Sequence, residues 1–329
     1  VAAGIKINSG AAHQIEHGAF TDPTDDGDLL NFENAQNLPI IIDNCSFNST
    51  DTDDENVKSN ALTSIAGSAA PTTFTNFSGN ISGEGNDDDD DNQINWFNDQ
   101  WYSFGNRDPA DRLQWWSAEG GPNDGVFNPT TAQHTTNSES EFIVVEGTNY
   151  VAISDWTTLG KITTQDGLTA DGIINPGTKI ITVEGDVDIK GKLVFTGNGT
   201  FDANGGFLAD GTGEITFHTD VGAGGKLRLL NSTADLGNNF IANEGTVEYD
   251  GAVQTIDDVT YHDLTISAVG AKTAGNNLAV SGDLNISLGD LLIGNNSLTL
   301  TGDFVMSGGS FTAGDNTGHT VGGSWTETA

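Results

Sequence analysis

The segment Gly282-Asp283-Leu284-Asn285-Ile286 is followed twenty residues later by Gly302-Asp303-Phe304-Val305-Met306. Two further apolar-x-apolar pairs recur at the same interval, namely Leu278/Val280 with Leu298/Leu300 and Leu291/Ile293 with Phe311/Ala313. Alternation of apolar and other residues is typical of a strand with one buried face, and the intervening Gly, Asn and Asp residues favour turns. Three short strands and three turns in about twenty residues describe one coil of a parallel β-solenoid.

The same pattern continues towards the N-terminus with a looser period. Asp263-Leu264-Thr265-Ile266 precedes the first motif by one coil, and Gly185-Asp186 precedes another apolar pair, Val187 and Ile189. An antiparallel sandwich, with strands every 8–12 residues or so, is the alternative, but its hairpins do not require a fixed register. We therefore predict an all-β chain in which residues 150–329 form a parallel β-solenoid of roughly nine coils. Right-handed connections are expected.

Two other regions are predicted. Residues 92–149 form a Trp-rich linking or capping segment with four of the six tryptophans, which are expected to cover the open end of the solenoid core. Within it, Asp108–Leu113 favours a short helix with Asp108 as N-cap and Pro109 as first helical residue.

Residues 1–91 form an N-terminal β-rich, Asp-rich region, either the end of a preceding solenoid or a separate β domain. Strands are expected within Ile40–Asn48 and Phe74–Ser78, and a short helix within Asn56–Ala70.

The charge balance excludes several functions. The 329 residues include 47 acidic and 11 basic side chains, a formal net charge of −36. Nucleic acids and anionic membranes require a basic surface that so few Lys and Arg residues cannot form. The longest apolar runs, such as Leu38–Ile42, are too short to span a bilayer. Cys45 is the single cysteine, and the chain begins at Val1 without a signal peptide, so we expect a chain processed or trimmed from a longer extracellular bacterial protein.

Clusters of Asp in the N-terminal region are the strongest candidates for a ligand site. Ca²⁺ takes about six to eight oxygen ligands, and Gly27 permits a sharp turn inside the first cluster, Asp22–Asp28. The alternative is a set of solvated loops, because the complete EF-hand pattern is absent and runs of like charge are usually flexible. The candidate Ca²⁺ ligands are Asp22, Asp25, Asp26, Asp28, Asp51, Asp53, Asp54, Asp87 and Asp89.

The sequence evidence for a catalytic site is weaker than the evidence for a Ca²⁺ site. Glycoside hydrolysis needs two carboxyl groups facing one substrate, whereas adjacent strand residues such as Asp257 and Asp258, or Asp25 and Asp26, point to opposite faces. A lyase also needs a basic residue to act on the sugar acid. Lys226 and Arg228 are the basic residues that lie centrally in the predicted solenoid, and no acidic residues are distinctively spaced around them. We therefore expect that the protein is not an enzyme.

Smaller features favour ordinary structural roles. His13 and His17 have metal-ligand spacing for a helix, but no third ligand is evident. Cys45 follows an apolar run, which favours a small buried side chain over a nucleophile. Gly222-Ala223-Gly224-Gly225 lacks the strand–loop–helix context of a phosphate loop. The tryptophans could stack on sugars, but a core or capping role is favoured.

The Trp-rich stretch, Gly120–Val126, the Gly-Asp coils and Gly245–Gly251 together resemble the repeat regions of large secreted surface adhesins of Bacteroidota-type bacteria, over roughly residues 95–329. This resemblance implies an extracellular β-solenoid with an adhesive or filament-forming role, and it brings no catalytic residues. We expect a structural protein of the bacterial cell surface, an adhesin or a filament component, with loops stabilised by Ca²⁺. Expected partners are further copies or a larger assembly of the same chain, and a surface glycan. The alternatives are a β-helix polysaccharide-degrading enzyme (lyase or glycoside hydrolase) and a carbohydrate-binding module.

Overall fold

The structure is a computed structural model, and the chain forms two compact units, Val1–Asp99 and Gln100–Ala329. This division falls inside the predicted Trp-rich segment 92–149, so Trp96 belongs to the first unit and the other three tryptophans of that segment to the second. The residues that the structure describes are 5–7, 13–16, 19–22, 30–32, 40–43, 45–49, 57–59, 72–75, 87–88, 94–97, 100–117, 128–129, 134–136, 138, 140–209, 211–232, 234–315 and 318–328.

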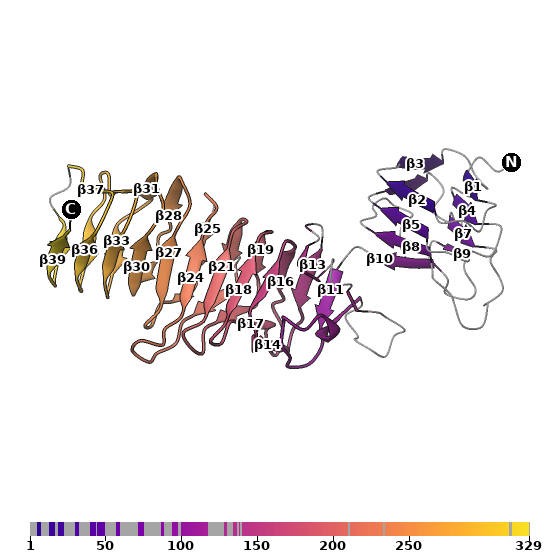
Figure 1. Cartoon of the computed structure of the whole chain (residues 1–329), viewed down its shortest axis with the longest axis horizontal. Helices are drawn as coiled ribbons and strands as arrows, with labels where there is room; N and C mark the ends of the chain where they lie inside the picture. Colours follow the sequence, from indigo (N-terminus) through magenta and orange to yellow (C-terminus); the bar gives the residue numbers. More distant parts are fainter. Residues whose placement is uncertain are drawn as a thin grey trace. The chain divides into compact units, whose positions relative to one another are not determined.

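In the described residues of the first unit, the strands are parallel and form three small sheets, ordered β1-β4-β7-β9, β2-β5-β8-β10 and β3-β6 (Figure 1). Each pairing joins strands from successive coils, and the coil length varies along the unit. The strands are β1 (Ile5–Ile7), β2 (His13–Glu16), β3 (Ala19–Asp22), β4 (Leu30–Phe32), β5 (Ile40–Asp43), β6 (Ser46–Ser49), β7 (Val57–Ser59), β8 (Thr72–Thr75), β9 (Asp87–Asp88) and β10 (Ile94–Phe97).

The short helix predicted within Asn56–Ala70 does not include Val57–Ser59. Val57–Ser59 is a strand that pairs with Leu30–Phe32, because parallel pairing with a neighbouring coil overrides the weak local preference for a helix. Residues 60–70 of that prediction lie outside the described residues.

The second unit is a parallel β-solenoid with three faces, as predicted. The third face is one continuous nine-stranded sheet, which confirms roughly nine coils, and coils begin before residue 150, at β11 and β13 (Figure 1). Its strands are β15 (Trp156–Thr158), β18 (Ile180–Val183), β21 (Thr200–Ala203), β24 (Lys226–Leu229), β27 (Thr246–Tyr249), β30 (Asp263–Ile266), β33 (Leu284–Ile286), β36 (Phe304–Met306) and β39 (Trp325–Glu327).

The first and second faces are each divided into two sheets. The first face contains, in sheet order, β12 (Trp115–Trp116), β11 (Gln100–Ser103), β13 (Glu141–Val144), β16 (Lys161–Thr164), β19 (Val187–Ile189), β22 (Phe207–Ala209) and β25 (Ala234–Asp235), then β28 (Gln254–Ile256), β31 (Ala271–Ala274), β34 (Asp290–Leu292) and β37 (Ser310–Thr312). The second contains β14 (Asn149–Val151), β17 (Ile173–Asn175), β20 (Lys192–Val194), β23 (Glu214–Thr216) and β26 (Asn239–Ile241), then β29 (Thr260–Tyr261), β32 (Leu278–Val280), β35 (Leu298–Leu300) and β38 (Thr320–Val321).

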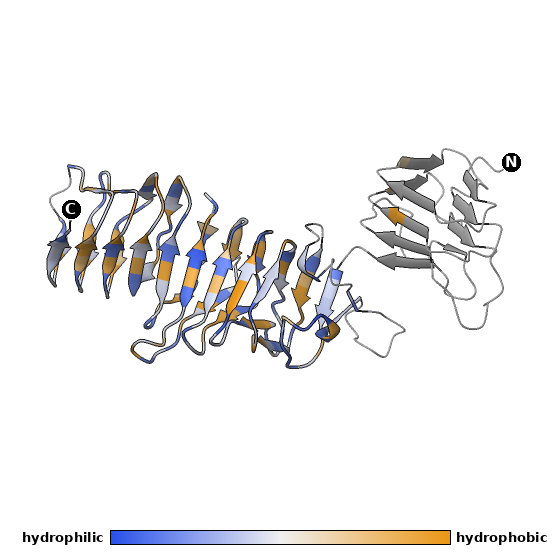
Figure 2. Ribbon diagram, viewed as in Figure 1, coloured by the Kyte–Doolittle hydropathy of each residue, from blue (hydrophilic) through white to orange (hydrophobic). Residues whose placement is uncertain are grey.

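The core of the second unit is a stack of apolar rows. Along its strands, hydrophobic and hydrophilic residues alternate, so each strand turns one face to the core (Figure 2). Each fully buried side chain of this size contributes about 1.5–3 kcal/mol. On the third face the inward row consists of Trp156, Ile181, Phe201, Leu227, Val247, Leu264, Leu284 and Phe304, all at most 3% exposed.

The repeated Gly-Asp pair has a direct structural cause. The Asp263 carboxylate accepts a hydrogen bond from the Asp283 amide (2.7 Å), and the Asp283 carboxylate accepts one from the Asp303 amide (2.8 Å). A Cβ at Gly302 would clash with the backbone carbonyl group of Gly282, so the coils can approach this closely only with glycine at that position. The motif therefore joins each coil to the next.

Tryptophans cover the N-terminal end of the solenoid core, as predicted. Trp101 and Trp115 are fully buried, and Trp115 contacts the rings of Phe142, Tyr150 and Trp156. Its strand β12 is antiparallel to β11, unlike every other pairing among the described strands, and so closes the edge of the first face.

The short helix begins later than predicted. Asp111, rather than Asp108, is the N-cap of a 3-10 helix over Arg112–Gln114, and its carboxylate accepts a bond from the Leu113 amide. Asp108 instead accepts a bond from the Ala110 amide and forms a preceding turn, so Pro109 lies outside the helix.

One coil of the solenoid is shorter than its neighbours. On the third face Leu264 pairs with Val247 in the coil before it and with Leu284 in the coil after it, and the interval back to Val247 is the shorter of the two along the chain. Among the described strands, β28 does not pair with β25, nor β29 with β26, whereas β27 and β30 continue the third face. We call this double interruption the seam. A shorter coil has a smaller circumference, so it cannot keep its strands in register on all three faces.

Side chains replace the missing ladder bonds at the seam. Gln254 is 3% exposed, and its Nε2 donates to the carbonyl oxygens of Leu229 (2.9 Å) and Asn231 (2.8 Å) in the preceding coil. Its Oε1 accepts a bond from the Gly251 amide (2.8 Å). One buried amide side chain therefore satisfies three backbone groups that regular strands would pair with each other.

A closed ring of three hydrogen bonds lies beside Gln254. The Asp257 amide donates to the Tyr249 hydroxyl (3.1 Å), the two tyrosine hydroxyls are 2.9 Å apart, and the Tyr261 hydroxyl donates to the Asp257 carbonyl oxygen (3.0 Å). Both tyrosines are fully buried, and burial raises the pKa of each hydroxyl. The ring stays neutral and holds the short coil against the core.

Candidate functional site

Charged side chains gather on the outer surface of the third face, around Arg228 of β24. Its guanidinium lies 3.4 Å from the Asp202 carboxylate on β21 and 4.0 Å from the Glu248 carboxylate on β27, and it also contacts Asp250. Lys226 pairs with Glu248 at 2.7 Å. Each of these pairs joins two coils. This charge cluster reinforces the stacking from outside the core.

The pKa values of two carboxyl groups in this cluster move in opposite directions. Burial is the main cause that raises the pKa of Asp202. Attraction to Arg228 opposes it, and repulsion from neighbouring carboxylates adds to it, so that the pKa is raised overall. Burial also opposes ionisation of Glu248, but hydrogen bonds from Lys226 and Ser267 and the attraction of Lys226 and Arg228 lower its pKa overall. Of these two carboxyl groups, Asp202 is therefore the less favourable as an anion.

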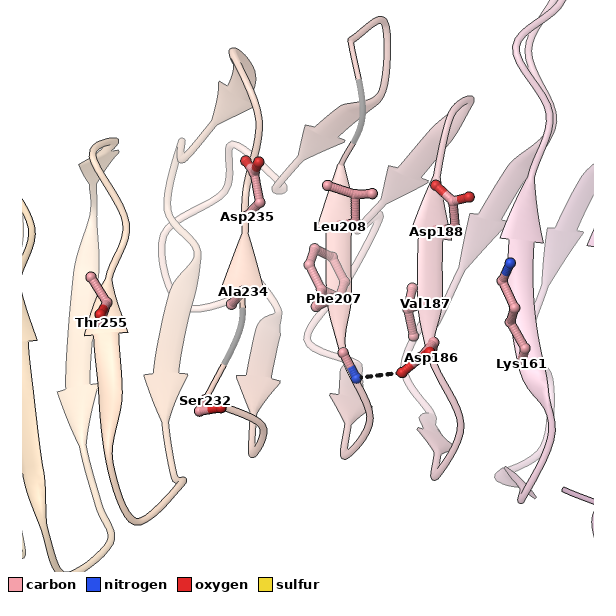
Figure 3. Close-up of a pocket in the computed structure, with 11 residues that line it drawn as sticks. Lys161, Asp186, Val187, Asp188, Phe207, Leu208, Ser232, Ala234, Asp235 and Thr255 are labelled. Carbon is pink, nitrogen blue, oxygen red and sulfur yellow. Dashed lines mark hydrogen bonds between the residues drawn. The ribbon is translucent and has the colours of Figure 1, made fainter.

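A groove of about 590 Å³ lies on the outer surface of the first face, and it reaches across the seam to Thr255 of β28 (Figure 3). Its lining comes from β16, β19, β22 and β25, together with the turns before them. The outward-facing side chains that line it are Lys161, Asp186, Asp188, Leu208, Ser232, Asp235 and Thr255.

The groove is acidic and has one apolar side chain at its centre. The Asp186 carboxylate accepts a bond from the Gly206 amide (2.8 Å), and Asp188 pairs with Lys190 at 3.1 Å. The Asp188 Oδ1 atom is shielded from solvent and has no hydrogen-bond partner among the described residues. Leu208 is 41% exposed, whereas the ring of Phe207 is only 4% exposed and belongs to the core. The lining therefore offers carboxylates and an aliphatic contact, but no exposed aromatic ring.

Most of the predicted Ca²⁺ ligands lie outside the described residues, namely Asp25, Asp26, Asp28, Asp51, Asp53, Asp54 and Asp89. The backbone of Asp22 ends β3, and that of Asp87 begins β9, each in a parallel sheet. Among the residues that the structure describes, no group of three or more His, Cys, Asp and Glu side chains is arranged to hold a metal ion. The Ca²⁺ sites remain a prediction.

The other residues considered as catalytic or metal-binding candidates lie in strands, in the core or in hydrogen-bonded turns where they are described. Both carboxylate oxygens of Asp257 accept backbone hydrogen bonds, from Leu236 (2.6 Å) and Asp258 (2.8 Å). Cys45 is buried, as predicted. His13 lies in β2, a strand rather than a helix, and His17 lies outside the described residues.

Sequence reasoning missed the acidic neighbours of Arg228. The prediction that no acidic residues are distinctively spaced around Lys226 and Arg228 is wrong, because Asp202 and Glu248 occupy the equivalent positions one coil before and one coil after Arg228. The interval from Asp202 to Arg228 is longer than the interval from Arg228 to Glu248, so a constant period would not align all three. The alternation pattern of each strand could have aligned them.

Comparisons of the chain with protein-family models, with curated proteins and with solved structures find no match. Within the described part of the chain, none of the helical segments has the length and apolar character needed to cross a membrane. The site must therefore be interpreted from its own geometry.

Proposed function

We propose that this protein is an extracellular structural protein of the bacterial cell surface, an adhesin or a component of a surface filament. The observation that carries the proposal is the continuous nine-stranded ladder of the third face, joined coil to coil by apolar rows, Gly-Asp hydrogen bonds and ion pairs. Such a stack transmits load along its axis through backbone hydrogen bonds. Its mechanism is passive: the solenoid is a spacer, and its loops and outer surface meet partners.

Ca²⁺ is proposed to stabilise the acidic loops of the N-terminal region. The net charge of −36 opposes compaction, and a divalent cation held by clustered carboxylates offsets that repulsion. The test is a thermal melt of the intact chain in about 5 mM CaCl₂, which is above the dissociation constants of about 0.1–1 mM typical of extracellular Ca²⁺ modules, and in excess EDTA, with MgCl₂ as the matched control. We expect a lower melting temperature in EDTA that Ca²⁺ but not Mg²⁺ restores. An unchanged melting temperature would reject the Ca²⁺ sites.

The main alternative is a β-helix enzyme that degrades polysaccharides, or a carbohydrate-binding module. Asp257 is occupied by two backbone hydrogen bonds, and the groove lacks an exposed aromatic ring on which a sugar could stack. These two observations favour the structural role.

The proposal is tested on the bacterium that produces the protein. Immunogold electron microscopy should place the solenoid outside the cell envelope, and in-frame deletion of the C-terminal coils 263–328 should reduce adhesion or shorten the surface fibre. Release of reducing or unsaturated ends from a polysaccharide panel by the purified chain, or labelling confined to the cytoplasm, would reject the proposal.

A further inference from the structure

The groove on the first face extends across the seam. The sheet of that face stops at β25, and β28 begins a new sheet, so Asp235 and Thr255 line the groove from opposite sides of the interruption. Exposed apolar side chains are present on both sides as well, since Leu208 is 41% and Val253 65% exposed. A molecule in the groove would therefore contact the coils before the seam and the coils after it. Only the sheet of the third face runs without interruption through both groups of coils.

We propose that this groove binds an extended basic segment of a partner protein. The charge of the lining supports this choice: it contains three carboxylates, Asp186, Asp188 and Asp235, and one ammonium group, that of Lys161. Asp188 pairs with Lys190 just outside the lining, which leaves Asp186 and Asp235 without a cationic partner among the lining residues. Lys161 is itself paired with Glu141 at 3.3 Å. The groove therefore presents net negative charge, and it lies in a chain whose net charge of −36 attracts cationic partners over long range.

The length of the groove fits a peptide in extended conformation. The lining strands β16, β19, β22 and β25 are successive neighbours in one sheet, and three intervals of about 4.8 Å give roughly 14 Å. An extended chain rises about 3.3 Å per residue, so about four residues span the part of the groove between β16 and β25. Asp188 and Asp235 lie two strands apart, and lysines on one side of the peptide, with flexible four-carbon stems, reach both.

The lining favours a peptide over a sugar polymer. Carbohydrate sites rely on exposed aromatic rings, and the ring of Phe207, the aromatic residue of the lining, is buried. Leu208 lies between the two carboxylates and instead suits the methylene stems of the lysines that reach them (Figure 3). The proposal that the groove binds a basic peptide does not depend on the proposed cell-surface role of the protein.

The test is fluorescence anisotropy of the intact chain with three labelled probes: an eight-residue peptide of alternating Lys and Val, the same peptide with Glu for Lys, and a glucosamine hexamer. We expect binding of the Lys-Val peptide alone. Binding of the glucosamine hexamer with equal or greater affinity would overturn the proposal in favour of an amino-sugar polymer.

A pair of matched variants separates the groove from general charge attraction. The groove variant D188N/D235N should weaken binding of the Lys-Val peptide about tenfold or more. The control D166N/D315N removes the same charge from exposed positions outside the groove and should change the affinity less than about twofold. Equal effects of the two variants would show non-specific attraction and overturn the proposal, as would the absence of any binding. Circular dichroism checks that both variants are folded.

Discussion

Replacing Gln254 by Met tests whether side chains hold the seam together. Met has a similar length and volume but cannot donate to the carbonyl oxygens of Leu229 and Asn231 or accept from the Gly251 amide. A buried polar group left without a partner costs about 1–3 kcal/mol. Because the contact to Asn231 is only partly buried, water will compensate some of this loss, and we expect a total of about 3 kcal/mol.

The assay has a global and a local part. In a unit spanning Gln100–Ala329, about 3 kcal/mol should lower the melting temperature by roughly 6–12 °C. Hydrogen exchange followed by mass spectrometry should show faster exchange in the coils on either side of the seam, residues 226–241 and 246–261, before the rest of the solenoid. Thr255→Val, an exposed neighbour, is the control and should change neither result. A shift below about 2 °C, or faster exchange spread evenly over all coils, would refute the role assigned to Gln254.

Two further predictions concern carboxylates. Asp283→Ala should destabilise the second unit by about 1 kcal/mol in urea unfolding, because the Asp303 amide loses its acceptor. Asp283→Asn keeps an acceptor and should leave the free energy of unfolding nearly unchanged. Equal losses of stability in the two variants would show that the charge of Asp283, and not its hydrogen bond, matters. Asp202 has a raised pKa, so the folded chain binds a proton there more readily than the unfolded chain, and its contribution to stability increases as the pH falls from neutral towards that pKa. Asp202→Asn should therefore raise the melting temperature at pH 7.5 more than at pH 4. The exposed control Asp315→Asn should show no such difference between the two pH values. An equal shift of the melting temperature of Asp202→Asn at both pH values would contradict the role of the raised pKa.

The sequence predicts the fold of the second unit well because its last coils have a constant length. The interval of twenty residues between Leu264, Leu284 and Phe304 is kept by the structure, and alternation alone identifies the buried side of each strand. In the first unit Thr73 pairs with Ile41 before it and with Asn95 after it, and the first of these intervals is much longer than the second. Parallel coils are therefore present there without a period that could be recognised.

The features that sequence analysis missed depend on departures from that period. The short coil between Val247 and Leu264 creates the seam, and the long interval between Asp202 and Arg228 hides the charge cluster. The position of the 3-10 helix was missed for a local reason. Asp108 and Asp111 are both suitable caps, and the choice depends on which backbone amides each carboxylate can reach after folding.

The Gly-Asp hydrogen bonds run in a single direction, from the amide of each coil to the carboxylate of the one before, through Asp263, Asp283, Asp303 and the Ser324 amide. Every coil in this series presents the same acceptor to its successor and the same donor to its predecessor. Duplication or loss of a twenty-residue segment in this part of the gene would therefore leave each remaining junction chemically unchanged. The solenoid can lengthen or shorten by whole coils during evolution without the invention of a new interface, whereas an insertion at the seam would have to rebuild the Gln254 and tyrosine contacts as well.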